Sequence, residues 1–211
     1  LDSWRPLFLQ WLCEESFGDP AHDLAHIKRV VASSLKLGAI EGANMEVLLP
    51  AAWLHDCVHV AKDSDERSQA SLYSADRASE LLAEAGYPRE YIASIHHVIH
   101  AHSFSANIKP TTIEAKVLQD ADRLDALGAI GLSRCLMLGG HMNKPLTSLD
   151  DPFCKQREAN DGEYVLDHLF VKLLSLGASM KTNAGLEMAR ERTAFLQQFL
   201  TQLELELDPV A

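Results

Sequence analysis

Apolar residues recur at spacings of three and four along most of this chain, and that spacing leaves few alternatives to α-helices. In the clearest case, over residues 22–40, one helix face carries Leu24, Ile27, Val30, Val31 and Leu35. The same spacing, or a high content of helix-forming residues, predicts further helices over residues 44–61, 65–86, 88–102, 111–140, 162–180 and 184–207. No stretch alternates apolar and polar residues as a half-buried strand would, so we predict an all-α fold.

The length of the chain and the absence of an internal linker favour a single domain over residues 1–211. A chain of 211 residues, 47% of them hydrophobic, can form one substantial core and is short for two. Residues 141–160 contain two prolines and follow no clear period, which predicts a long irregular loop of the kind that often carries function. The sequence contains no repeat or low-complexity tract that would divide it.

The formal net charge of −11 limits the partners of this chain. Binding to a nucleic-acid polymer needs a basic face, whereas a small phosphorylated substrate stays open because a bound metal can reverse the local field. The four cysteines are widely spaced, which indicates free thiols in a reducing compartment. No apolar run is long enough to span a membrane. We therefore expect a soluble cytoplasmic protein.

Histidine and aspartate side chains recur inside three of the predicted helices: His22 and His26, His55 and Asp56, and Asp122 and Asp125. Two imidazoles and two carboxylates delivered from three helices form a good ligand set for a divalent metal, although such a mixed set leaves the identity of the metal open. The alternative is a buried polar network that ties helices together. For His22 the alternative is an exposed or capping residue.

Four of these residues carry a resemblance to a known family. His26 in "HDLAHIKRV", the pair His55–Asp56 in "AAWLHDCV" and Asp122 in "DADRLDALGAIG" resemble the H…HD…D signature of the HD-domain metal-dependent phosphohydrolases. Further blocks, among them "KDSDERSQASLYSADRASELL", "HAHSFSANI" and "LDHLFVKLL", resemble the YedJ-type bacterial branch in the same order. The resemblance covers roughly residues 20–205 and is strong because the whole set occurs in order.

The resemblance implies an all-helical HD domain, with its H…HD…D core at about residues 20–130 and C-terminal helices at 160–207 packing on that core. It implies that His26, His55, Asp56 and Asp122 bind a divalent ion, which could be Mn, Mg, Fe, Ni, Co or Zn. It also implies hydrolysis of a phosphate ester or phosphoanhydride, with nucleotides as the commonest substrates.

For catalysis we hypothesise that a metal-bound hydroxide attacks phosphorus in line, with Asp56 among the catalytic residues. Asp125 and His59 are candidates for the general base. The resemblance includes His102, in "HSFSAN", which we expect to line the pocket and to touch phosphate or a metal-bound water. His96, His97 and His100 could hold a second metal, but ordinary surface or core histidines explain them better, and we favour a single metal.

Basic side chains are expected to meet the phosphate oxygens, and four are candidates: Lys62, Arg67, Arg123 and Lys172. Each could instead be a solvated surface charge. Lys172 follows His168 by four residues, which places both on one face of a late helix.

Three functions remain open at this point. The first is a metal-dependent phosphohydrolase that acts on a nucleotide or another small phosphorylated metabolite. The second is a catalytically silent HD-fold ligand-binding or regulatory module, and the third is an HD-fold oxygenase with two irons. The complete set of four ligands favours the enzyme, because a silent module has no need of all four. The final helix could also pack against a second copy, which leaves a homodimer open.

Overall fold

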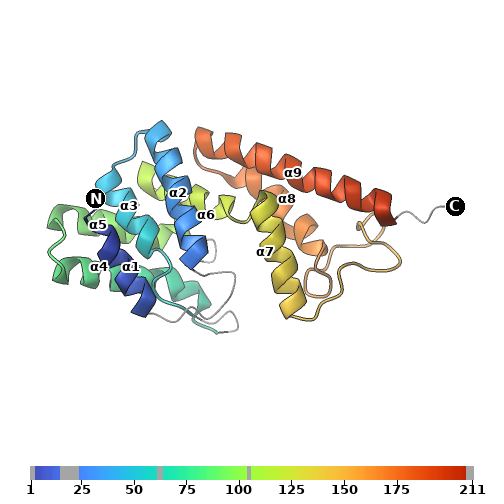
Figure 1. Cartoon of the computed structure of the whole chain (residues 1–211), viewed down its shortest axis with the longest axis horizontal. Helices are drawn as coiled ribbons and strands as arrows, with labels where there is room; N and C mark the ends of the chain where they lie inside the picture. Colours follow the sequence, from blue (N-terminus) through green and yellow to red (C-terminus); the bar gives the residue numbers. More distant parts are fainter. Residues whose placement is uncertain (1–2, 15–23, 61–63, 104–105, 208–211) are drawn as a thin grey trace. The chain divides into compact units, whose positions relative to one another are not determined.

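The computed structural model describes residues 3–14, 24–60, 64–103 and 106–207 (Figure 1). Every regular element within those ranges is helical, and none of the described residues forms a strand. The prediction of an all-α fold is therefore confirmed. Among the same residues, no helix combines the length and apolar character needed to cross a membrane.

The described chain divides into two compact units, and the first contains residues 1–122 and 181–185. Its helices are α1 (Arg5–Glu14), α2 (Leu24–Glu41), α3 (Met45–Leu54), α4 (Ala70–Glu84), α5 (Arg89–His102) and α6 (Ile113–Leu124), which runs into the second unit after Asp122. Helix α3 packs against α2 and α5, and α4 packs along α5 (Figure 1). The core of this unit is formed by fully buried side chains such as Leu48, Leu54 and Ile99.

Helix α3 begins where the sequence predicts but ends earlier. The Asn44 side chain caps the helix by accepting a hydrogen bond from the Glu46 N–H at 3.0 Å, and Pro50 lies inside the helix without ending it. The helix stops at Leu54, so the predicted helix over 44–61 was too long. As a result His55 and Asp56 lie in the turn that follows α3. A turn can direct two consecutive side chains toward one point more freely than a helix can.

The predicted helix face of residues 22–40 is largely correct. Ile27, Val30 and Val31 are buried, but Leu35 is 43% exposed and does not belong to the core. The described part of the helix has a buried stripe that reaches Leu37. The apolar stripe therefore follows the helix period and bypasses Leu35.

The second compact unit contains residues 123–180 and 186–211. Its elements are α7 (Gly128–His141), a five-residue π-helix (Leu169–Leu173), the short α8 (Leu174–Leu176), a 3₁₀ turn (Gly177–Ser179) and most of α9 (Asn183–Leu207). The predicted single helix over 111–140 is wrong, because the chain breaks between α6 and α7. At that break Gly128 has a φ of +67°, a conformation that glycine adopts without strain.

Residues 142–166 form no helix, as expected for the irregular loop, but this loop is tightly bonded. The Arg157 guanidinium donates two hydrogen bonds to the fully buried Asp167 carboxylate. The Asp151 carboxylate accepts backbone N–H bonds from residues 155–157. Charge pairing thus replaces helical hydrogen bonds in holding this loop.

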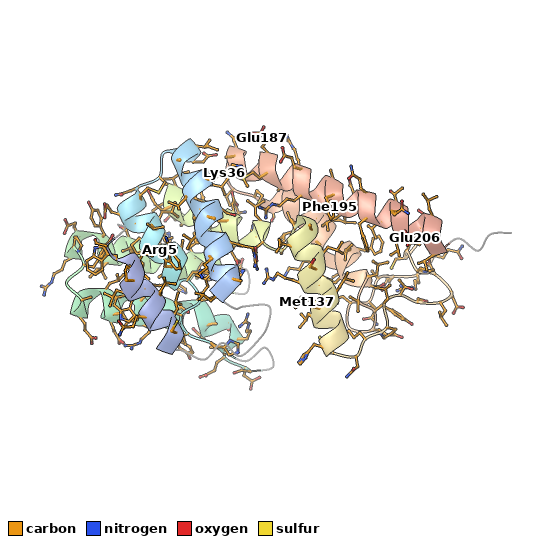
Figure 2. All side chains as sticks on the ribbon, viewed as in Figure 1. Arg5, Lys36, Met137, Glu187, Phe195 and Glu206 are labelled. Atoms are coloured by element: carbon orange, nitrogen blue, oxygen red, sulfur yellow. The ribbon has the colours of Figure 1, made fainter. Side chains whose placement is uncertain are left out.

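Some apolar surface remains exposed on the second unit. Met137 on α7 and Phe195 on α9 are 62% and 41% exposed (Figure 2). Homodimer formation stays a prediction, as does the arrangement of the whole chain as a single domain.

Candidate metal centre

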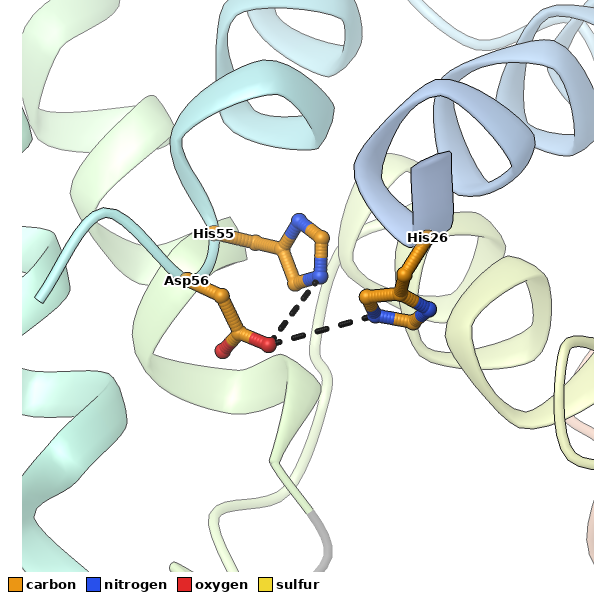
Figure 3. Close-up of side chains that lie close together, drawn as sticks. All are labelled: His26, His55 and Asp56. Carbon is orange, nitrogen blue, oxygen red and sulfur yellow. Dashed lines mark ion pairs between the residues drawn. The ribbon is translucent and has the colours of Figure 1, made fainter. Parts of the chain in front are cut away.

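His26, His55 and Asp56 bring their side chains together inside the first unit. His26 lies in the first turn of α2, and the other two lie in the turn after α3. One ligand atom from each residue lies within 4.8 Å of those from the other two. Figure 3 shows the Asp56 carboxylate facing both imidazoles, with Oδ2 3.9 Å from His26 Nε2 and 3.6 Å from His55 Nε2. Such a group could hold a metal ion.

Asp122 adds a second carboxylate from α6. Its Oδ1 lies 3.4 Å from His26 Nε2, so all four residues of the predicted ligand set meet in one place. The two histidines are buried, whereas the Asp56 and Asp122 side chains are 31% and 29% exposed. The cluster therefore has an imidazole side facing the core and a carboxylate side that solvent can reach.

Backbone carbonyl groups fix the tautomers of two rings in this cluster. His55 Nδ1 lies 2.9 Å from the Ala52 carbonyl oxygen, and His102 Nδ1 lies 2.6 Å from that of Ile99. Because a carbonyl only accepts, each Nδ1 carries the proton and each Nε2 is turned toward the cluster. A proton held on one nitrogen leaves the other nitrogen as the ligand atom, the usual arrangement for a metal-bound histidine.

His102 also belongs to this group, although the sequence analysis gave it a role with phosphate or water. It is buried at the end of α5, and its Nε2 lies 3.5 Å from Asp56 Oδ1. The ring centroids of His55 and His102 are 4.9 Å apart. Asp56 therefore faces imidazoles through both of its oxygens.

The electrostatics of the cluster favour a bound cation. Burial is the main cause that lowers the pKa of His55 to about 4, so this imidazole is neutral at neutral pH. Burial raises the pKa of Asp56, but the nearby His55 and His102 outweigh it and hold that pKa well below its usual value. The pKa of Asp122 is also lowered, because the hydrogen bond and charge of His26 outweigh burial. Two ionised carboxylates thus face at least one neutral imidazole.

One atom provides a direct test of the fit to a metal. His55 Nε2 is buried and, among the described residues, accepts and donates no hydrogen bond. A buried ring nitrogen in that position costs free energy unless something pairs with it. A divalent cation would use this lone pair together with the two carboxylates, and the mixed nitrogen and oxygen donors suit several transition metals. The residues present therefore fit the group.

The predicted phosphate contacts of the first unit are only partly described. Arg67 lies just before α4, and its Nη1 donates to the Val60 carbonyl at 2.9 Å. Arg67 therefore braces the chain that leaves the HD pair, and its contact with phosphate stays a prediction. Lys62 and His22 lie outside the described residues. His59 is exposed.

Three further predicted residues belong to the second unit. Asp125 forms a 2.8 Å ion pair with Arg134, and Arg123 Nη1 donates to the Ser179 carbonyl at 2.9 Å. Lys172 is exposed on the π-helix. Their roles as general base and as phosphate contacts stay predictions.

The neighbouring histidines of α5 make ordinary polar contacts. His96 Nε2 lies 2.9 Å from Asp76 Oδ1, and His97 Nε2 lies 2.9 Å from the Thr111 hydroxyl. Among the described residues, His26, His55 and Asp56 form the one group of three ligands packed closely enough for a metal. These contacts support the interpretation of His96 and His97 as surface residues.

Ser74 supports the cluster from α4 and was not predicted from the sequence. The Ser74 hydroxyl on α4 accepts a hydrogen bond from the Val58 N–H at 3.2 Å, and the Cys57 thiol reaches the Ser74 carbonyl at 3.5 Å. Ser74 thus holds the two residues that follow Asp56. Both of these bonds involve a backbone atom and join residues 16 or 17 positions apart, so they leave no pattern in the sequence.

An all-α unit with a His…His-Asp…Asp cluster at its core is the arrangement of the HD domain, and comparison with known proteins agrees. The HD domain family matches residues 23–127. YpgQ of Bacillus subtilis, an uncharacterized protein, is 32% identical over 200 residues, which cover 93% of this chain and 88% of YpgQ. This chain belongs to the HD-domain family of hydrolases.

Two solved structures extend the similarity to the whole chain. The crystal structure of B. subtilis YpgQ in complex with ADP has a TM-score of 0.74 at 31% identity and covers 98% of this chain and 99% of YpgQ. An HD-superfamily hydrolase from Bacillus thuringiensis has a TM-score of 0.75 at 29% identity, with coverage of 99% and 96%. The similarity thus includes the C-terminal region beyond the HD match.

Proposed function

We propose that this chain is a metal-dependent phosphohydrolase that cleaves a phosphate ester or phosphoanhydride bond of a nucleotide or a similar small metabolite. The observation that carries the proposal is the meeting of His26, His55, Asp56 and Asp122, with solvent access on the carboxylate side. A regulatory module that only binds a ligand does not require this complete set.

The chain's own residues have distinct parts in the proposal. His26 and His55 form the buried side of the ligand set, whereas Asp56 and Asp122 supply its negative charge. When bound, the metal would neutralise phosphoryl charge and make water a stronger nucleophile. His102 lies against Asp56 Oδ1, where its Nε2 can contact a substrate oxygen or orient a water.

The proposed substrate class rests on charge and on one relative. A chain with a net charge of −11 needs local positive charge to bind an anionic phosphate, and the metal would supply it. We propose that four basic side chains add to this positive charge: Lys62, Arg67, Arg123 and Lys172. The YpgQ structure that this chain resembles contains ADP, a nucleotide with a phosphoanhydride bond. A nucleotide is therefore the first substrate to test.

The experiment compares purified protein with its His55→Ala and Asp122→Ala variants. Metal content is measured by elemental analysis, and release of phosphate and of pyrophosphate is followed across a panel of nucleotides. We expect about one metal per chain and turnover in the wild type, with both lost in the two variants. The released product identifies the bond that is cleaved.

His97→Ala is the matched control, because it removes an imidazole of α5 that bonds to Thr111 rather than to the cluster. It should keep both metal and activity. A wild-type protein that takes up no divalent metal under any loading condition would refute the proposal. Stoichiometric metal without turnover of any nucleotide would instead favour a regulatory module.

A further inference from the structure

Gln119 links the two helices that carry Asp122 and His102. It lies on α6, three residues before Asp122, so the two side chains share one side of that helix. Gln119 is only 3% exposed, and its Nε2 donates a 2.9 Å hydrogen bond to the Ala101 carbonyl. Ala101 immediately precedes His102, the last residue of α5. The link therefore joins the positions next to two members of the cluster.

The position of this link at the end of α5 makes it mechanically important. The last carbonyl groups of a helix have no partner within the helix and need donors from elsewhere. The His102 ring satisfies the Ile99 carbonyl, and Gln119 satisfies the Ala101 carbonyl. The last turn of α5 is thus fixed partly by its own cluster residue and partly by α6.

The buried amide of Gln119 uses its donor and leaves its acceptor without a hydrogen bond among the described residues. Because the Ala101 carbonyl accepts, the amide NH₂ of Gln119 must face it, and Oε1 faces the other way. Oε1 is buried and accepts no hydrogen bond among the described residues. An apolar side chain of the same size would avoid this unpaired oxygen but would leave the Ala101 carbonyl without its donor. The glutamine is therefore needed for the bond that joins α6 to the residue beside His102.

We propose that Gln119 is a positioning residue of the metal centre, which sets the separation between His102 and Asp122. His102 Nε2 lies 3.5 Å from Asp56 Oδ1, and Asp122 Oδ1 lies 3.4 Å from His26 Nε2. Gln119 joins α6, which carries Asp122, to the end of α5, which carries His102, and His102 in turn contacts Asp56. This inference rests on the proposed function, because it assumes that the cluster binds a metal.

The test replaces Gln119 with methionine, which keeps an unbranched side chain of similar length but removes the donor. Wild type and Gln119→Met are loaded with Co²⁺, and the affinity and the visible absorption spectrum of the bound ion are recorded. We expect Co²⁺ affinity to fall by about 10- to 100-fold, as for other residues that support metal ligands, and the spectrum to change. A purely structural residue would alter neither.

Tyr87→Phe is the matched control in the same unit. Tyr87 is buried, and its hydroxyl donates a 2.7 Å hydrogen bond to the Glu46 carbonyl, away from the ligand set. This variant loses a comparable hydrogen bond and should keep the wild-type Co²⁺ affinity and spectrum. If Gln119→Met melts at a lower temperature but binds Co²⁺ as wild type does, the inference is wrong and the proposed function stands. If wild type binds neither Co²⁺ nor any other divalent metal, the proposed function itself fails.

A second measurement does not depend on the folding of a variant. In ¹⁵N-labelled wild-type protein, the side-chain amide signals of Gln119 should shift when Zn²⁺ is added, because the link is mechanically coupled to the ligands. Signals that stay unchanged while Zn²⁺ binds would also overturn the inference.

Discussion

The two compact units handle buried charge in different ways. In the second unit the buried Asp167 meets Arg157, and Asp125 meets Arg134, so each carboxylate has a permanent cation as partner. In the first unit Asp56 instead faces imidazoles, one of which is neutral at neutral pH. The ion pairs of the second unit are complete in the protein alone. The cluster around Asp56 in the first unit would instead gain from an added cation. The contrast separates charges that serve the fold from charges that serve a ligand.

The largest effect is expected from Asp56→Asn, which keeps the shape of the side chain and removes its charge. We expect the catalytic efficiency to fall by at least ~10³-fold, since loss of a single stabilising group in an active site already costs about 10²–10³. Steady-state release of phosphate or pyrophosphate measures it. Metal-free Asp56→Asn should lose some stability, because the lowered pKa of Asp56 means that its charge is stabilised in the folded protein. The loss should be smaller than that of Asp167→Asn, since the partners of Asp56 are imidazoles rather than a permanent cation. A larger loss than that of Asp167→Asn would contradict the contrast between the units.

Asp167→Asn should show the opposite pattern. Asp167 is fully buried whereas Arg157 is 24% exposed, so removing the carboxylate charge weakens the charge-assisted hydrogen bonds of a half-buried pair and should destabilise the protein by about 1.5–3 kcal/mol. Urea unfolding should report this loss, while the affinity of the remaining folded protein for metal stays unchanged. A combined Arg157→Met and Asp167→Asn variant should recover part of the stability. No recovery would mean that the pair does not act as a unit.

The same pair predicts a pH dependence of stability. Burial raises the pKa of Asp167, but the hydrogen bonds from Arg157 and Asn160 outweigh burial, and the folded-state pKa is lowered. A lowered pKa means that the folded chain binds the proton less readily than the unfolded chain does. The stabilisation is therefore complete above the unfolded value of about 3.9 and is lost as the pH falls through the lower folded value.

Urea unfolding of wild type and Asp167→Asn at several pH values between 7 and 2 checks this prediction. The difference between the two proteins should stay constant above about pH 5 and shrink below about pH 4. A difference that grew toward acid would mean that the pKa is shifted in the other direction.

Much of this fold follows from apolar spacing, but helix ends do not. The starts of α3 and α5 lie one residue after the predicted starts at 44 and 88, and the Asn44 side chain makes a local cap at the start of α3. The break between α6 and α7 was missed, since the residues around it read as helix formers and the break depends on the conformation at Gly128. The early end of α3 was missed because the residues that follow Leu54 also read as helix.

The candidate site shows a similar division. The four residues predicted as ligands, which the structure brings together, were chosen from their residue types, spacing and family resemblance, because metal ligands are drawn from few residue types. Gln119 and Ser74 were not found, since both bind backbone atoms of segments far away in the sequence. The pairing of Arg157 with Asp167 was also missed, because it lies in a loop without a period.

Metal addition should stabilise the protein by a moderate amount. An ion that binds only the folded state adds about 2.7 kcal/mol when its free concentration is 100 times the dissociation constant. Thermal unfolding of protein treated with a chelator and then titrated with Mn²⁺ measures the shift. Asp122→Ala should show little shift, because it lacks one of the two carboxylates. An equal shift in both proteins would place the ion outside the cluster.

The smallest effect is expected from His97→Ala, and it tests whether position or residue type matters. His97 lies on the same helix as His102, but its Nε2 contacts the Thr111 hydroxyl rather than Asp56. Loss of one partly exposed hydrogen bond costs about 0.5–1.5 kcal/mol, and the metal affinity should not change. His102→Ala in parallel should weaken metal binding or turnover, because its ring touches the carboxylate that joins both sides of the cluster. If the two variants lowered metal affinity equally, the histidines of α5 would act as one binding surface, and the boundary drawn around the cluster would be wrong.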